Sequence, residues 1–497
     1  MTIINEPHQS ELINLLGYFQ SQRYDDAEQL AIQLSERFPN HPFSWKVLWA
    51  LLNRTNRLSE ALNACQKSVL LEPNNAEAHN NLANTFHKIG KFEAAESSCR
   101  QAIEIEPNYA EAYNNLGNIL RDLYRFEEAL ISFKEAISLK SNYAEAYNNL
   151  ANTFHKIGKF EAAESSYRKA ISFDLNYAEA YNNLGVLLKE LGRHAEADKC
   201  YRDALKIKSD LKVALLNLGQ LLFDKGQFEE ALTKFDLCNN SNAKARALSC
   251  LYALGKINEI YQRIETESKF KDENLRIAAM AAFLEETEQK ETANNFCKKP
   301  LDFIHFSNIS DHIDDSNLFI SELIKELNDV KSVWEPYKQS TIKGYQSQIN
   351  IFENSTGKID YLKSIIIQEI DGYYSKFKKK SCSFIQNWPL QKKLTGWHVI
   401  LKQHGSQEAH IHPSGWMSGV IYLKVVPALE KNEGAIEFSL NGKRYFKKNA
   451  SKLTFQPKIG DIVFFPSSLY HKTIPFTSNE ERIIVSFDLK PKAIKKT

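Results

Sequence analysis

The chain has 497 residues, more than one hydrophobic core usually serves, so we expect two or more domains. Its composition, 43% hydrophobic and 25% charged residues, excludes disordered and collagen-like classes, and no run of about 18 apolar residues predicts a membrane span. The 63 Lys and Arg residues nearly balance 61 Asp and Glu residues, so the net charge of +2 argues against nucleic acid as a partner.

The seven cysteines are scattered singly, with no C-x-x-C pair and an odd total, which indicates a reducing compartment. The N-terminal residues have neither the basic start nor the apolar core of a secretory signal. We therefore expect a soluble, cytoplasmic protein.

The N-terminal half repeats with a period of 34 residues over about seven units. Three units begin with NYAEAYNNL, at residues 108, 142 and 176, and apolar and small residues recur at helical spacing within each unit. A glycine that tolerates positive φ falls between the two predicted helices of four units, at Gly90, Gly158, Gly192 and Gly226. The pattern resembles the tetratricopeptide repeat, which implies an all-α superhelix over 1–243, and the helical pattern continues without the signature over 244–300.

Asparagines recur every 34 residues on the first helix of these units, at Asn81, Asn115, Asn149, Asn183 and Asn217. A carboxamide can both donate and accept, so such a ladder can hold the backbone of an extended peptide. It resembles the asparagine ladder in the repeat domain of O-linked N-acetylglucosamine transferase, which implies a protein or peptide partner. The alternative is that these side chains bond neighbouring helices only.

The period is lost from about residue 301, where a second domain begins. We expect helical support and the first strands over 301–393, with amphipathic helices at 318–330 and 358–380. From 394 to 490 short apolar runs separated by Gly, Asn and Pro predict a β-sandwich or barrel of jelly-roll type, and 491–497 is a tail.

Potential ligands concentrate in this last domain. Alternation along QEAHIHP would place Glu408, His410 and His412 on one face of a strand. His471 ends a later apolar strand, and Arg482 begins the next one, RIIVSFDL.

This order resembles the double-stranded β-helix of the Fe(II)/2-oxoglutarate-dependent oxygenases, and most closely the branch that is often fused to tetratricopeptide repeats. The resemblance implies three protein ligands to Fe(II), with 2-oxoglutarate and O2 as cosubstrates. It also implies that Arg482 binds the far carboxylate of 2-oxoglutarate, with Tyr422 as a second contact and Ser486 as a weaker candidate.

The sequence departs from the family in one position, because His412 stands where most members have Asp or Glu. Three interpretations follow: His410, His412 and His471 bind the metal together, Glu408 replaces His412, or the site is degenerate. Two functions follow in turn. One is a dioxygenase, a hydroxylase of a protein or peptide presented by the repeats. The other is a repeat scaffold for protein interaction with an inert jelly roll.

Overall fold

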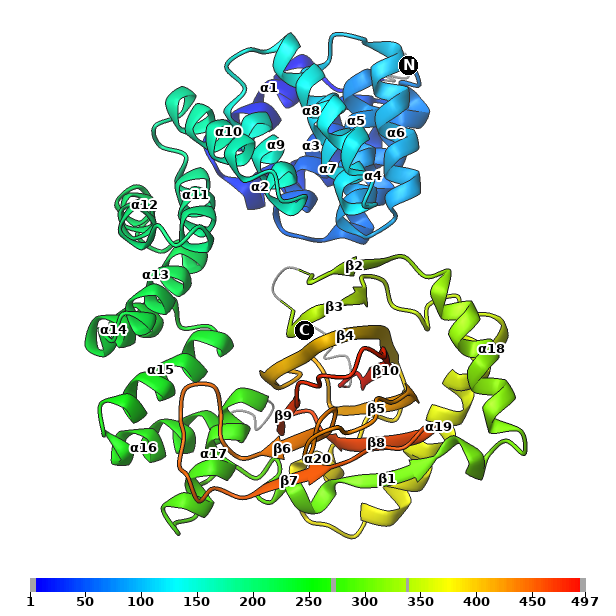
Figure 1. Cartoon of the computed structure of the whole chain (residues 1–497). Coiled ribbons are helices and arrows are strands. Elements are labelled where there is room, and N and C mark those ends of the chain that lie inside the picture. The colour runs from blue at the N-terminus through cyan, green and yellow to red at the C-terminus, as the bar shows by residue number, and fades with distance from the viewer. Residues whose placement is uncertain (1–5, 270–273, 337–338, 492–497) are drawn as a thin grey trace. The chain divides into compact units, whose positions relative to one another are not determined.

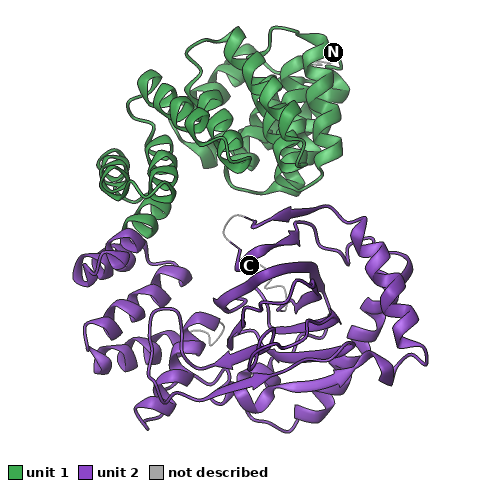
Figure 2. Ribbon diagram, in the orientation of Figure 1, with its two compact units in different colours: residues 1–218 green, residues 219–497 purple. Residues whose placement is uncertain are grey.

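The structure is a computed structural model, and it describes residues 6–269, 274–336 and 339–491 (Figure 1). The chain forms two compact units, residues 1–218 and 219–497 (Figure 2). In the part of the chain that the structure describes, no helix is long and apolar enough to cross a membrane. Of the predicted tail, all but residue 491 lies outside the described residues.

Unit 1 is a repeat array in which successive helices pack in pairs, as the 34-residue period predicts. Its helices are α1 (Gln9–Gln20), α2 (Tyr24–Arg37), α3 (Pro42–Arg54), α4 (Leu58–Leu71), α5 (Ala76–Lys88), α6 (Phe92–Ile105), α7 (Ala110–Asp122), α8 (Phe126–Leu139), α9 (Ala144–Lys156), α10 (Phe160–Phe173), α11 (Ala178–Glu190), α12 (His194–Ile207) and the first half of α13 (Lys212–Asp224).

Small residues let the two helices of a pair approach closely. A Cβ on Gly117 of α7 would lie 2.6 Å from the ring of Phe133 on α8, so only glycine fits there. The glycines predicted for the turns have positive φ, as at Gly158, where it is 77°.

The recurring asparagines bond from one repeat to the next. Asn115 Nδ2 donates to Asn80 Oδ1 at 2.9 Å, and Asn149 Nδ2 donates to Asn114 Oδ1 at 3.0 Å. Asn183 and Asn217 make the same bond one and two repeats further along. The side-chain amides of the ladder therefore stabilise the array itself.

Unit 2 begins with helices that continue the array and pack against the sheet. They are the second half of α13, α14 (Phe228–Cys238), α15 (Ser241–Ala253), α16 (Ile257–Ser268) and α17 (Leu275–Thr287). Nine of the 13 residues of α17 are buried, and most of its apolar side chains share one core with residues of the sheet such as Tyr422 and Phe438. A helix that is apolar all round is stable only when it is covered on all sides.

Both predicted amphipathic helices are present, as α18 (Ser316–Asn328) and α19 (Gly357–Phe377). Together with α20 (Ser383–Gln386) and the 3-10 turns η1 (Pro300–Phe303) and η2 (Ile309–Asp311), they lie beside the sheet (Figure 1). Buried residues of α18 and α19 share a second core with the other face of the sheet.

The described strands form one curled antiparallel sheet, which confirms the predicted jelly-roll class (Figure 1). They are β1 (His305–Asn308), β2 (Ser332–Trp334), β3 (Thr341–Ser347), β4 (Leu394–His410), β5 (Met417–Lys424), β6 (Ile436–Ser439), β7 (Lys452–Phe455), β8 (Asp461–Pro466), β9 (Tyr470–Thr473) and β10 (Arg482–Leu489). The order is β1-β8-β5-β10-β4-β9-β6-β7, and β3 pairs with β4 and β2.

This topology positions the candidate site. The end of β4 pairs with β9, with His410 opposite His471, while the first half of β4 pairs with β10. Residues 412–416 then turn back across the end of β10, where Trp416 N donates to Leu489 O at 2.7 Å. Side chains from β4, β9 and β10 therefore meet at one end of the sheet.

Candidate metal centre

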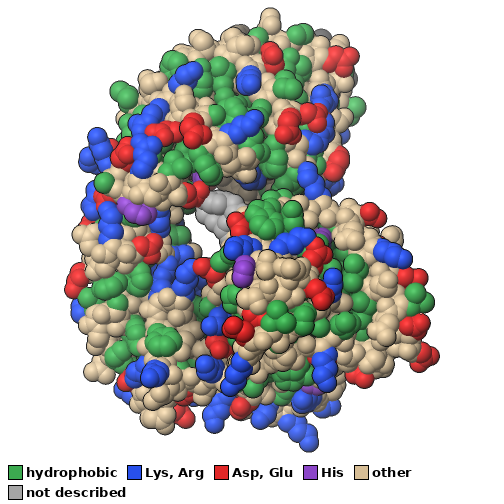
Figure 3. Space-filling model, in the orientation of Figure 1, with side chains coloured by type: hydrophobic (Ala, Val, Ile, Leu, Met, Phe, Trp, Pro, Cys, Tyr) green, Lys and Arg blue, Asp and Glu red, His purple; other side chains and the backbone are tan. Residues whose placement is uncertain are grey.

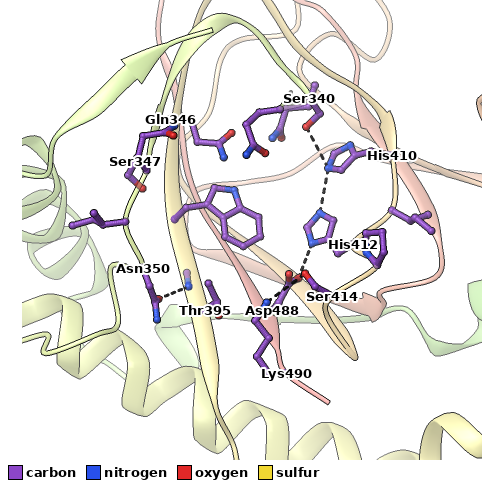
Figure 4. A pocket seen from close by; sticks show the side chains of 18 of the residues that line it. Ser340, Gln346, Ser347, Asn350, Thr395, His410, His412, Ser414, Asp488 and Lys490 are labelled. Carbon is purple, nitrogen blue, oxygen red and sulfur yellow. Dashed lines mark hydrogen bonds and ion pairs between the residues drawn. The ribbon is translucent and has the colours of Figure 1, made fainter. Parts of the chain in front are cut away.

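Three histidines form a compact cluster at this end of the sheet. His410, His412 and His471 each offer a ring nitrogen, and these three atoms lie within 4.8 Å of one another. The Nε2 atoms of His410 and His412 are 3.2 Å apart (Figure 4). Two nitrogens that bind one metal at about 2.1 Å and at a right angle are about 3 Å apart, so the spacing suits a shared ion.

The other nitrogen of each ring is engaged by an acceptor. His410 Nδ1 lies 2.6 Å from Glu408 O, His412 Nδ1 lies 2.6 Å from Asp488 Oδ1, and His471 Nδ1 lies 3.2 Å from Leu469 O. Carbonyl and carboxylate oxygens only accept, so each Nδ1 carries the proton. In the neutral rings the lone pairs are therefore on the three Nε2 atoms, the nitrogens that ligate metals.

Burial favours the neutral form of two of these rings, His410 and His471. It lowers the pKa of His410 to about 3, with the neighbouring His412 adding to the effect. Burial, and then His410 and His412, lower the pKa of His471 well below its ordinary value. A cation placed among the three Nε2 lone pairs would relieve their mutual repulsion.

His412 occupies the position where most members of the family have a carboxylate ligand. A carboxylate, that of Asp488, contacts the other ring nitrogen of His412. Asp488 Oδ1 accepts from His412 Nδ1 and, at 2.7 Å, from Ser418 Oγ, which lies 2.7 Å from Ser467 Oγ. The backbone is close here as well, because a Cβ on Gly415 would lie 2.6 Å from Ser467 Oγ and 2.9 Å from Asp488 Cγ. A buried carboxylate on the far nitrogen fixes the tautomer and the direction of a ligating imidazole.

Glu408 does not join the cluster, so the expected alternation over Glu408, His410 and His412 is wrong. The pairing of β4 with β9 shifts register between Gln407 and His410, and this bulge rotates the chain by one residue. The carboxylate of Glu408 is 53% exposed and pairs with Lys443 at 2.9 Å.

Arg482, Tyr422 and Ser486 are all buried inside the sheet. The Arg482 guanidinium lies over the Tyr422 ring, 5.0 Å from its centroid, and burial lowers the pKa of Arg482 and raises that of Tyr422 to about 12. Arg482 Nε and Nη1 and the Tyr422 hydroxyl have no hydrogen-bond partner in the described chain. A buried guanidinium that has no carboxylate partner among the described residues is costly, so this pair fits an anionic group.

Aromatic contacts link this pair to the histidines. The His471 ring lies 4.6 Å from the Phe465 ring and 6.2 Å from the Phe438 ring, centroid to centroid. Both phenylalanines belong to the same buried cluster as Tyr422. His471 and Tyr422 therefore border one core.

A cavity of about 470 Å³ opens beside the cluster (Figure 4). His410 and His412 line it together with Trp397, whose ring lies 5.4 Å from that of His412. Most of its other lining side chains are polar, including Ser340, whose Oγ lies 3.4 Å from His410 Nε2. Trp416 packs in the core instead, where its indole N–H donates to Phe384 O at 2.9 Å.

Comparison with solved structures finds matches that cover part of the chain. Two structures of MamA share 27% and 26% identity, cover 32% and 34% of this chain and 92% of their own, and have a TM-score of 0.29. A structure of Pseudomonas aeruginosa pilF shares 19% identity, covers 42% of this chain and 96% of its own, and has a TM-score of 0.37. No curated protein matches the chain.

Family models match both halves of the chain. Tetratricopeptide repeat models match residues 76–109, 98–131, 117–158, 151–192 and 178–211. The model described as "Putative 2OG-Fe(II) oxygenase" matches residues 395–488, which contain the three histidines, Tyr422, Arg482 and Asp488. The chain therefore joins an array of tetratricopeptide repeats to a domain of the 2OG-Fe(II) oxygenase type.

Proposed function

We propose that the protein is an Fe(II)- and 2-oxoglutarate-dependent dioxygenase in which His410, His412 and His471 bind the metal. The observation that carries this proposal is the arrangement of the rings. Each Nδ1 is held by an acceptor, which leaves Nε2 of each ring to bind a metal, and the three rings offer nitrogens within 4.8 Å of one another. In a domain of this family, such a set supports iron binding over a purely structural role.

The buried pair of Arg482 and Tyr422 supports binding of 2-oxoglutarate as the cosubstrate. In this proposal Arg482 binds the far carboxylate of 2-oxoglutarate, and the Tyr422 hydroxyl is a second donor to the same group; the unpartnered polar atoms of both side chains support it. Ser486 lies on the same strand face as Arg482 and is a weaker candidate. When bound, iron and 2-oxoglutarate supply the oxidising chemistry, in which 2-oxoglutarate and O2 become succinate, CO2 and a hydroxyl group on the substrate.

The protein's own residues perform the remaining tasks. Asp488 and the carbonyls of Glu408 and Leu469 orient the imidazoles, and Trp397 forms part of the wall beside His412. The polar cavity would admit the substrate to the metal.

We also propose that the repeat array presents a protein or peptide substrate. Tetratricopeptide repeats generally mediate protein interactions, and the asparagine Nδ2 bonds between repeats leave side-chain oxygens such as Asn115 Oδ1 as acceptors for a peptide N–H. An array of unrelated peptides probed with the full chain tests this. We expect binding that is largely independent of peptide sequence in the wild type and weak binding when Asn115 and Asn183 are both changed to Ala.

Turnover of 2-oxoglutarate without substrate tests the enzyme. The wild type should form succinate only when Fe(II) is present, and Arg482→Gln should raise the KM for 2-oxoglutarate about tenfold or more, because a charged hydrogen bond contributes about 1.5–3 kcal/mol. Lys443→Gln, which removes the partner of Glu408, serves as the control and should leave KM unchanged. Absence of succinate in the wild type would favour the scaffold with an inert jelly roll.

A further inference from the structure

Three arginines belong to segments of unit 2 that contact one another. At the start of α17, Asn274 Nδ2 donates to Ser241 O of α15 at 2.7 Å. Tyr445, next to Arg444, packs on Phe283 of α17 with ring centroids 4.7 Å apart. Arg246 is on α15, Arg276 is in the first turn of α17, and Arg444 is in the loop between β6 and β7. Burial, then the charges of Arg444 and Arg276, lower the pKa of Arg246 to about 10. Burial and the charge of Arg276 also lower the pKa of Arg444. The three guanidinium groups, here called the arginine cluster, thus repel one another.

No carboxylate pairs directly with this cluster in the described chain. The guanidinium of Arg276 has neither a hydrogen-bond nor an ion-pair partner among the described residues, while its backbone N–H donates to Asn274 Oδ1 at 3.2 Å. Arg246 Nε donates to Asn242 Oδ1 at 3.1 Å. Arg444 donates to Gln220 Oε1 and lies over the Phe223 ring, 5.0 Å from its centroid.

The charge balance at the cluster is positive. Asp224 is the carboxylate whose charge favours the protonated forms of Arg246 and Arg444, and it also accepts from Gln220 Nε2 at 2.5 Å. Three partly desolvated cations beside one carboxylate are unfavourable unless another anion joins them.

Arg276 connects the cluster to the candidate metal centre. Arg276 lines the same cavity of about 470 Å³ as His410 and His412. A molecule in that cavity can therefore contact the guanidinium of Arg276 and the metal centre at once.

We propose that the arginine cluster binds an anionic group of the substrate, a carboxylate or a phosphate, while the carbon that is oxidised lies at the three histidines. Guanidinium groups bind either anion through paired N–H donors. That the bound anion belongs to a substrate rests on the proposed function. The anion site itself is defined by the cluster and the cavity.

Binding of a fluorescein-labelled glutamate peptide to the full chain tests the site, measured by anisotropy without iron or 2-oxoglutarate. We expect the wild type to bind it, inorganic phosphate to displace it, and a matching glutamine peptide to bind weakly. Arg276→Gln combined with Arg444→Gln should weaken binding about tenfold or more. Arg263→Gln is the matched control, because Arg263 on α16 is paired with Asp236 and Glu259, and it should bind within about twofold of the wild type.

Thermal unfolding provides a second measurement that does not depend on the peptide. Arg276→Gln should unfold at the same temperature as the wild type or higher in phosphate-free buffer, because the substitution removes like-charge repulsion. Phosphate should raise the midpoint of the wild type and leave that of the double variant unchanged. A wild type that binds neither probe, or a double variant that binds both as the wild type does, would overturn the inference.

The anion site and the proposed function can be refuted independently of each other. His471→Ala should lose iron binding and keep glutamate-peptide binding, while the double variant should keep iron binding. Peptide binding without any Fe(II)-2-oxoglutarate complex would leave the anion site standing and refute the oxygenase. The reverse result would refute the anion site alone.

Discussion

At the three histidines, the hydrogen bonds to Nδ1 decide which nitrogen faces a metal. His410 and His471 donate from Nδ1 to carbonyls two residues earlier in the chain, at Glu408 and Leu469, so local backbone geometry is enough to set these bonds. The bond to His412 is different, because Asp488 is 76 residues away and is itself held by Ser418. The position of His412 therefore depends on a side chain of another strand.

Loss of Asp488 should weaken the metal site without removing a ligand. We predict that Asp488→Ala raises the Kd for Fe(II) about 10- to 100-fold, because the His412 ring loses the acceptor that fixes its tautomer. Asp488→Asn keeps a side-chain oxygen as acceptor, so its affinity for Fe(II) should fall less than that of Asp488→Ala. Anaerobic titration with Fe(II) against a competing chelator measures both, and equal affinities for wild type and Asp488→Ala would show that the carboxylate has no orienting role.

The sequence alone could have identified Asp488 as a candidate residue of the site. Alternation along RIIVSFDL, which places Ser486 on the face of Arg482, also places Asp488 there, two residues further on. What the sequence could not reveal is the turn at residues 412–416, which brings His412 over the end of β10. The contact depends on tertiary structure, so spacing alone could not have found it.

At the scale of single elements, irregularities in the strands explain the wrong expectation for Glu408. The alternating pattern assumes a regular strand, but β4 contains a bulge between Gln407 and His410. Earlier in the same strand, His404 has a φ of 61°. Nothing in the letters QEAH distinguishes a bulged strand from a straight one. Short strands such as β1 and β7, each four residues long, also lack a periodic signal.

The helix pairs of the array depend on glycine where an aromatic ring crosses. Gly117→Ala should destabilise unit 1 by about 1–3 kcal/mol, because the new Cβ would overlap the Phe133 ring. Gly17→Ala on α1 is the control, since a Cβ there meets nothing within 4 Å, and it should be neutral or stabilising by up to about 1 kcal/mol. Chemical denaturation followed by circular dichroism compares the two, and equal effects would contradict the packing argument.

The buried His398 on β4 makes the sheet sensitive to acid. Burial lowers its pKa to about 4, so as pH falls below about 6.5 the unfolded chain takes up a proton before the folded chain does. Stability is therefore lost between about pH 6.5 and 4, and this one group should cost about 2 kcal/mol between pH 6.5 and 5.

His398→Phe removes that contribution while keeping an aromatic ring in the core. Guanidinium unfolding, followed by tryptophan fluorescence, gives the free energy of unfolding of wild type and variant at pH 7.5 and pH 5. The contribution of His398 is the part of the change with pH that the variant lacks. The loss of stability on acidification should be about 2 kcal/mol smaller in the variant. An equal loss in both proteins would show that His398 does not titrate with folding.

For the whole molecule, sequence and structure agree best where a pattern is long or strictly spaced. About seven units in register predict the helical array, and the spacing of two histidines and a distant histidine predicts which residues gather in the jelly roll. The arginine cluster could not be predicted, because α15, α17 and the loop after β6 become neighbours only in the fold. Acidic and basic side chains are interspersed over the visible surface (Figure 3), in keeping with the balanced composition.

If three histidines hold Fe(II) beside 2-oxoglutarate, the ternary complex should have a charge-transfer absorption band under anaerobic conditions. We expect this band in the wild type and in Glu408→Ala, whose carboxylate pairs with Lys443 away from the cluster. His412→Ala and His471→Ala should lose the band. No band in the wild type, or a band that survives in His412→Ala and disappears in Glu408→Ala, would show that these histidines do not form the iron site.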